Sequence, residues 1–182
     1  WEYWCEKNDV LFVPFEKPIE DDLFKFRINW QKAIFVFDEL ERRNIDYDQI
    51  ALVDSSVIVK WDCPNFFNLM DNLRWVKDSV DGYKEFFNGF ELDISKYFRS
   101  GFMVFNESHR DFFNSFKKLY LENSDTFIEL QDKIVRKGND QTPINYWIQK
   151  NNVELNLLPH TLWMCSHLHR KEMLGHNWQL DE

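Results

Sequence analysis

The chain has 182 residues, of which 44% are hydrophobic and 29% are charged. This is the length of one domain, and the apolar content is sufficient for a sizeable core, which excludes a disordered chain. The formal net charge of −9 argues against nucleic-acid binding, because that function needs a cationic surface facing the phosphates.

The first half of the chain predicts strands alternating with a helix. Residues 10–13 form a short apolar run that predicts a buried strand. Residues 24–43 have apolar side chains at helical spacing, and Asn44 is a plausible end for that helix. The runs at 49–53 and 57–59 predict two further strands. This order predicts an α/β fold with a mixed, mainly parallel sheet flanked by helices.

The second half predicts more helix than strand. Helices are expected over 66–69, 108–121, 125–135 and 140–150, and strands over 98–105 and 153–158. Asp140 is a typical N-cap residue, and Pro143 in the first turn agrees with a helix start. The chain begins without Met and stops without an ending signal, so we expect residues 1–182 to be a single domain truncated at one or both ends.

Several features bear on location and on the aromatic content. Cys5, Cys63 and Cys165 form no zinc-site spacing, and their odd number indicates a reducing compartment. No apolar run approaches the roughly 18 residues of a membrane span, so we expect a cytoplasmic protein. The aromatic share of 18% is high, and core packing is the first explanation for it.

Asp54 is the most informative position for function. It follows directly after a predicted buried strand, where open α/β sheets place groups that bind ligands. A carboxylate there could hold Mg²⁺ or Mn²⁺ beside a diphosphate. The alternative is a turn-forming Asp with Ser55 and Ser56.

For the other candidate site residues, a purely structural role explains the sequence as well as a functional one does. Asp140 at a helix start could orient or deprotonate an acceptor hydroxyl, although an N-cap role would explain it. Arg27 and Lys32 could contact phosphates, or they could be solvated surface charges. His167 and His169 have a spacing found in metal sites, but we do not expect zinc there. The motifs of P-loops, dinucleotide folds and serine hydrolases are absent from the sequence.

Four segments, in this order, resemble those of the GT-A-type glycosyltransferases, particularly small virus- or bacteria-encoded members. They are residues 26–32 (FRINWQK), 47–56 (YDQIALVDSS), 99–106 (RSGFMVFN) and 140–145 (DQTPIN). The family moves a sugar from a nucleoside diphosphate onto an acceptor, so the resemblance implies a hexosyltransferase-like enzyme with a Rossmann-like GT-A fold. UDP-sugars are expected before GDP-sugars, with a glycan or protein as acceptor.

The resemblance also implies roles for individual residues. Asp54 and Asp140 would be catalytic, and Gln141 and Asn106 would bind the acceptor. The donor would be bound by Arg27, Lys32, Asp54, Ser55, Ser56, Ser100 and Gly101. Mn²⁺ or Mg²⁺ would be held by Asp54, with His167 and His169 as further ligands. Ser56 stands where the family's Asp-x-Asp motif has its second carboxylate, which leaves a weaker site for a hard cation.

Two other functions fit the same residues. One is a non-catalytic module that binds a nucleotide or a sugar and has lost the transfer chemistry, which the replacement by Ser56 favours. The other is an interaction domain that uses exposed aromatic side chains.

Overall fold

A computed structural model describes residues 1–55, 81–98, 100–132 and 140–155, with single positions at 57, 59, 63, 65 and 67. These residues are mainly helical. The α-helices are α1 (Glu2–Lys7), α2 (Ile28–Ile34), α3 (Val36–Arg42), α4 (Asp81–Phe86), α5 (Arg110–Asp132) and α6 (Gln141–Lys150). The short 3₁₀ helices are η2 (Ile94–Lys96) and η3 (Glu107–His109), and the strands are β1 (Ile50–Val53) and β2 (Phe102–Phe105).

The sheet corrects the predicted fold class. Among the described residues it has two strands, β1 and β2, which pair antiparallel with Val53 opposite Phe102 and Ile50 opposite Phe105. A mainly parallel, Rossmann-like sheet is therefore wrong for this part of the chain. The prediction was based on the order strand, helix, strand in the first half of the chain, whereas the partner of β1 is β2, which lies far along the sequence and runs in the opposite direction.

Of the other predicted strands, the one at residues 10–13 is not formed, and the one at 153–158 is not formed in its described part. Residues 10–13 have no regular structure, and Leu11 is 67% exposed. An apolar run is therefore not sufficient for a strand when no partner strand lies beside it. Residues 153–155 are also irregular, and 156–158 lie outside the described residues. The predicted elements at 57–59 and 66–69 fall largely outside them as well, and Val57 and Val59 belong to no strand.

The helices expected in the second half of the described chain are confirmed. Helix α6 confirms the helix expected at 140–150, and α5 covers both helices expected between residues 108 and 135 as far as Asp132, with non-helical geometry at Asn123 near the expected junction. The helix expected over 24–43 is divided at Phe35 into α2 and α3. Asn44 ends α3 in a left-handed conformation (φ 52°), in the manner typical of a helix C-terminus.

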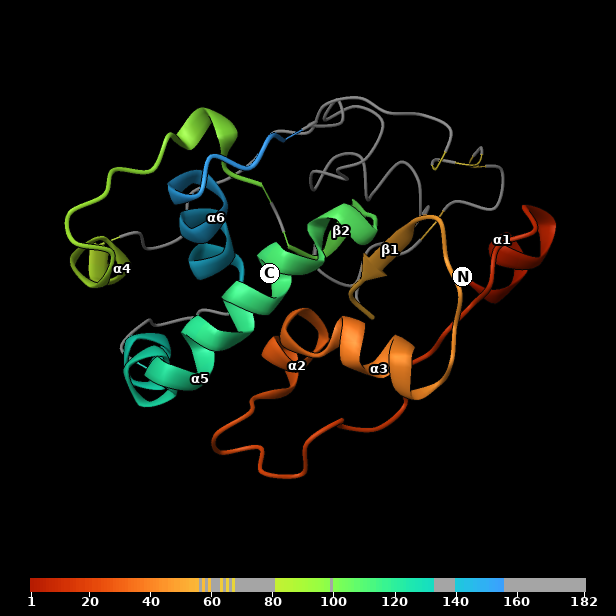
Figure 1. Cartoon of the computed structure of the whole chain (residues 1–182), viewed down its shortest axis with the longest axis horizontal. Helices are drawn as coiled ribbons and strands as arrows, with labels where there is room; N and C mark the ends of the chain where they lie inside the picture. The colour runs from red at the N-terminus through yellow and green to blue at the C-terminus, as the bar shows by residue number, and fades with distance from the viewer. Residues whose placement is uncertain are drawn as a thin grey trace, which may run out of the picture.

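Helix α5 runs through the middle of the molecule, with α2 and α3 on one side and α6 on the other (Figure 1). Trp30 of α2 is fully buried against α5, where its ring lies 4.5 Å from that of Tyr120 and its indole N–H donates to Gln131 at 3.1 Å. Most of the described aromatic side chains pack in this way, as expected from the composition. Within the described ranges, no helix is long and apolar enough to cross a membrane.

Candidate functional site

Lys32 joins three segments that are far apart in the sequence. It lies in the last turn of α2, and its Nζ donates to Oδ1 of Asp54, the residue after β1. The same Nζ lies 3.3 Å from Oδ2 of Asp140, at the start of α6, and donates to the carbonyl of Ser100 at 3.2 Å. We refer to Lys32, Asp54, Ser100 and Asp140 as the Lys32 cluster.

The sheet and Gly101 place Asp54 in the cluster. The backbone N–H of Asp54 donates to the Gly101 carbonyl at 2.8 Å, which continues the pairing of β1 with β2 by one residue. A β-carbon on Gly101 would lie 3.1 Å from Oδ2 of Asp54. The absence of a side chain at Gly101 therefore lets the carboxylate lie directly against the backbone.

Asn145 holds the Ser100 segment against α6. Its side chain accepts from the backbone N–H of Phe98 at 2.9 Å and donates to the carbonyls of Phe98 and Gln141, both at 2.8 Å. Asn145 is completely buried, so these bonds have no competition from water. The sequence predicts no role for Asn145, since only its burial on α6 distinguishes it from a surface amide.

Burial differs sharply within the cluster and shapes its electrostatics. The side chain of Asp140 is 2% exposed, that of Lys32 12% and that of Asp54 37%. Burial raises the pKa of Asp140 to about 6, against the opposing attraction of Lys32. Burial lowers the pKa of Lys32, but the carboxylates of Asp140 and Asp54 outweigh that effect and hold it above the ordinary value. The cluster thus has a fixed inner carboxylate and an accessible outer one.

The described residues do not fit the divalent metal that the resemblance implies. No group of three or more His, Cys, Asp or Glu side chains in the described ranges could hold one. Both carboxylates of the cluster already pair with the ammonium of Lys32. Ser56, His167 and His169 lie outside the described residues.

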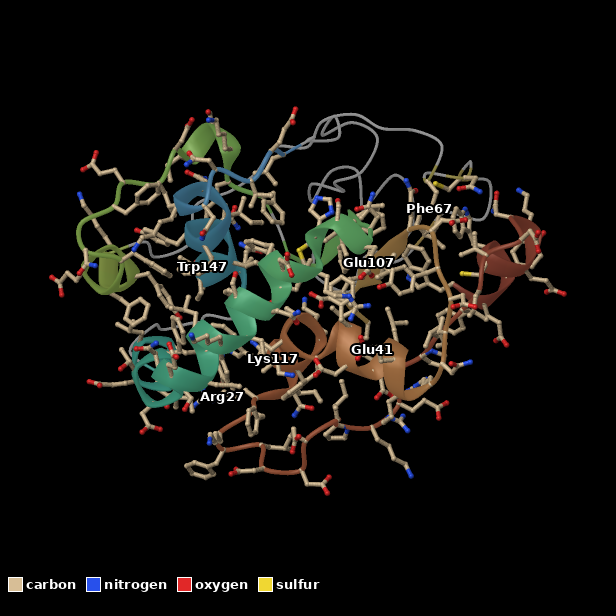
Figure 2. All side chains as sticks on the ribbon, viewed as in Figure 1. Arg27, Glu41, Phe67, Glu107, Lys117 and Trp147 are labelled. Carbon is tan, nitrogen blue, oxygen red and sulfur yellow. The ribbon has the colours of Figure 1, made fainter. Side chains whose placement is uncertain are left out.

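Of the residues expected to bind the donor, Arg27 does not join the cluster. Its guanidinium pairs with Asp132 at the end of α5, with both contacts at 2.8 Å (Arg27 is labelled in Figure 2). Ser55 is exposed in the turn that follows Asp54. In that turn the Val57 N–H donates to the Asp54 carbonyl at 2.9 Å, while the Asp54 side chain faces Lys32.

The residues expected to bind the acceptor have structural partners. Asn106 follows β2 and caps η3, where its Oδ1 accepts from the Ser108 N–H at 3.1 Å. It therefore lies at the far end of β2 from Gly101, which precedes the strand. The side chain of Gln141 donates to the hydroxyl of Tyr97 at 3.2 Å. Asp140 precedes α6 as expected, but its side chain makes no capping hydrogen bond and faces Lys32 instead.

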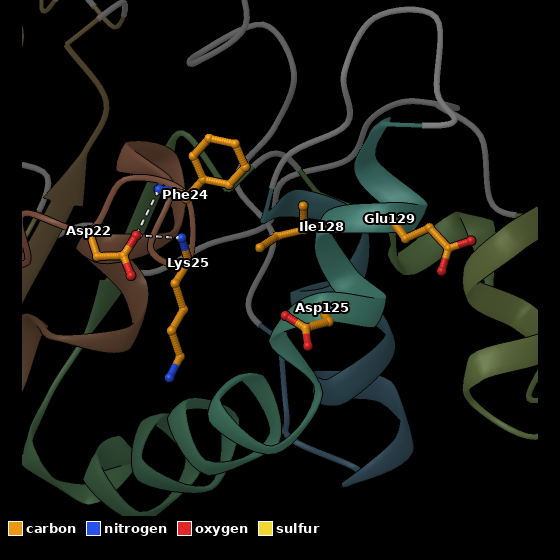
Figure 3. Close-up of a pocket in the computed structure, with 6 residues that line it drawn as sticks. All are labelled: Asp22, Phe24, Lys25, Asp125, Ile128 and Glu129. Carbon is orange, nitrogen blue, oxygen red and sulfur yellow. Dashed lines mark hydrogen bonds between the residues drawn. The ribbon is translucent and has the colours of Figure 1, made fainter.

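A hollow of about 370 Å³ lies away from the cluster, between the loop before α2 and the second half of α5 (Figure 3). It is lined by Asp22, Phe24, Lys25, Asp125, Ile128 and Glu129. None of these is an expected site residue, and Phe24 is 89% exposed. We place the candidate site at the Lys32 cluster because it pairs ionisable groups, two of them largely buried, from separate segments of the chain, and such groups are typical of functional sites. The other buried carboxylate among the described residues, that of Glu39, pairs only with its neighbours Arg42 and Arg43.

Comparisons of the chain with models of known protein families, with curated protein sequences and with solved structures found no match. The chemistry of the Lys32 cluster is that of one ammonium shared by a buried and an accessible carboxylate. Such a group can bind an anion through the ammonium, or hydroxyls through the outer carboxylate.

Proposed function

We propose that the chain transfers a sugar from a nucleoside-diphosphate sugar to an acceptor hydroxyl, at the Lys32 cluster. The observation that carries the proposal is the convergence of residues that the glycosyltransferase resemblance assigns to one site. Lys32, Asp54, Ser100 and Asp140 come from its four separate segments, yet they meet around one ammonium. The proposal depends on these residues and not on the parallel-sheet fold, which the structure contradicts.

The transfer reaction requires the charges that the cluster provides. The bond between the sugar C1 and the diphosphate oxygen breaks, C1 bonds to the acceptor oxygen, and the acceptor hydroxyl gives its proton to a phosphate oxygen of the departing diphosphate. The departing diphosphate gains negative charge, which a nearby ammonium such as that of Lys32 stabilises. The accessible carboxylate of Asp54 is suited to accept hydrogen bonds from sugar hydroxyls. Asp140 is too buried to touch an acceptor in this structure, so we assign it the positioning of Lys32.

The proposal is tested by following nucleotide release and acceptor labelling. The chain is incubated with UDP-glucose, UDP-galactose, UDP-N-acetylglucosamine or GDP-mannose and with glycan or protein acceptors. We expect transfer from one of these donors, and its loss in Asp54→Ala with an unchanged circular dichroism spectrum. Asp48→Ala is the matched control, because Asp48 is an exposed aspartate in the loop before β1. Full transfer by Asp54→Ala would contradict the assignment.

A non-catalytic binding module is the second candidate, and one observation favours it. Apart from Asp54, the cluster has no accessible carboxylate that could act as a base. If nucleotide binds but no donor loses its sugar, with or without acceptor, then the binding module replaces the transferase. Loss of nucleotide binding in Asp54→Ala would then still place the ligand at the cluster.

A further inference from the structure

The cluster raises the question of which cation neutralises the diphosphate. Enzymes that bind nucleoside diphosphates need positive charge beside the phosphates, from a metal ion or from Lys and Arg. The carboxylate of Asp54, which the resemblance assigns to a metal ion, pairs with Lys32, and so does the neighbouring carboxylate of Asp140. The ammonium of Lys32 therefore lies where a divalent cation would have to bind.

We propose that the ammonium of Lys32, and not a divalent cation, is the counter-cation for the diphosphate of the donor. The inference rests on the proposed function. It is specific to Lys32, since Arg27, the other cation expected at the donor, is committed to a two-contact pair with Asp132. A bidentate pair between Arg and a carboxylate leaves a guanidinium less available for phosphate.

The unequal burial of the two carboxylates indicates how the diphosphate would enter. Asp140 is the inner partner and keeps Lys32 in place, because its side chain is almost completely enclosed. Asp54 is the outer partner, and its carboxylate is accessible enough to be exchanged. On binding, a phosphate oxygen replaces Asp54 as the partner of Nζ, and the released carboxylate accepts hydrogen bonds from the donor sugar.

The protonation of Asp140 supports this exchange. If both carboxylates are ionised, the cluster has one negative charge in excess, which disfavours an incoming anion. The raised pKa of Asp140 makes its neutral form accessible near neutral pH, and an approaching diphosphate favours that form further. With Asp140 neutral and Asp54 released, the charge of Lys32 is available to the phosphate.

Isothermal titration calorimetry with UDP and with GDP tests the inference on the full 182-residue chain. Each titration is run in excess EDTA and again with Mn²⁺. The key variant is Lys32→Met in an Asp140→Asn background, compared with Asp140→Asn alone, so that no buried charge is left without its partner. Lys118→Met is the control, because Lys118 is an exposed lysine on α5. Lys32→Arg tests whether positive charge alone is sufficient.

We expect one nucleotide to bind in EDTA with little change on adding Mn²⁺, and Lys32→Met to weaken that binding by about tenfold or more, with no effect of Lys118→Met. Binding that appears only with Mn²⁺ would overturn the inference and leave the proposed function standing. Binding in EDTA that is unchanged in Lys32→Met would also overturn the inference and leave the proposed function standing. Failure of both nucleotides to bind in either condition would overturn the proposed function itself.

Discussion

Gly101 and Asp54 lie so close together that a β-carbon on Gly101 would be 3.1 Å from the carboxylate oxygen Oδ2 of Asp54. This contact would be tighter than nine in ten of those that real β-carbons make, so the neighbouring group would have to move by a few tenths of an ångström. Asp54 is the accessible member of the Lys32 cluster, and its carboxylate is the group that can give way. Its position relative to Lys32 therefore depends on the residue at 101 being glycine.

We expect Gly101→Ala to weaken nucleotide binding while changing stability by no more than about 1 kcal/mol, because a partly exposed carboxylate can shift at little cost. Calorimetry and urea denaturation measure the two effects separately. Gly89→Ala is the contrasting control. No atom lies within 4 Å of its added β-carbon, but its φ of +76° is unfavourable for alanine, so it should cost about 1–2 kcal/mol of stability and leave binding unchanged. Unaltered binding in Gly101→Ala would contradict this account of Asp54.

The buried carboxylate of Asp140 should make stability depend on pH. Its pKa is raised from an ordinary value of 3.8 to about 6 in the folded chain, so folding favours the protonated acid. This contribution is fully present below about pH 3.8 and is lost as the pH rises through about 6. Asp140→Asn lacks the titration. The unfolding free energy of the variant minus that of the wild type should therefore rise between pH 4 and pH 7, by on the order of 2 kcal/mol.

Urea denaturation at several pH values measures this difference. Asp48→Asn, an exposed replacement of the same kind, should show no such rise. A difference between Asp140→Asn and the wild type that stays constant over this pH range would mean that Asp140 titrates normally, and hence that it is not enclosed beside Lys32.

Asn145 should be important for stability and for the geometry of the cluster. Asn145→Ala removes a buried side chain that bonds both backbone groups of Phe98 and the carbonyl of Gln141. Leaving these groups unsatisfied should cost about 2–4 kcal/mol and loosen Ser100, whose carbonyl accepts from Lys32. Denaturation and nucleotide titration below the melting point check both effects.

Asn151→Ala is the matched control for this prediction. Asn151 also bonds a backbone carbonyl, that of Trp147 at 2.7 Å, but it is exposed at the end of α6. Water can satisfy that carbonyl, so the loss should be below about 1 kcal/mol. Equal losses of unfolding free energy in the two alanine variants would show that the buried hydrogen bonds of Asn145 stabilise the fold no more than an exposed one does.

The helices could be predicted from the sequence to a large extent, and so could β1 and β2 as separate strands, but the antiparallel pairing of the two strands could not. Helical spacing is a local signal, which is why α5 and α6 were expected nearly at their observed bounds. Strand pairing is not local. The apolar runs at residues 10–13 and 49–53 look alike in the sequence, yet only the second finds a partner. The direction of pairing follows from the path of the chain between β1 and β2, which periodicity does not reveal.

The resemblance predicts the residues of the Lys32 cluster at one site, but the contacts between them could not be predicted from the sequence. Lys32, Asp54, Ser100 and Asp140 were chosen for their chemistry and for their place in the quoted segments, and the structure brings them together. Arg27 and Asn106 were chosen on the same grounds and lie in other contacts. What separates the two groups is tertiary contact, and tertiary contact together with burial also identifies Asn145.

The measurement that tests the central claim most directly is the change in melting temperature produced by UDP and GDP, in the wild type and in Asp54→Ala. A ligand that binds only the folded chain raises its melting temperature by mass action. We predict a rise with one of the two nucleotides in the wild type and in Asp48→Ala, and its loss in Asp54→Ala. No rise with either nucleotide in the wild type, or an equal rise in Asp54→Ala, would contradict a nucleotide site at the Lys32 cluster.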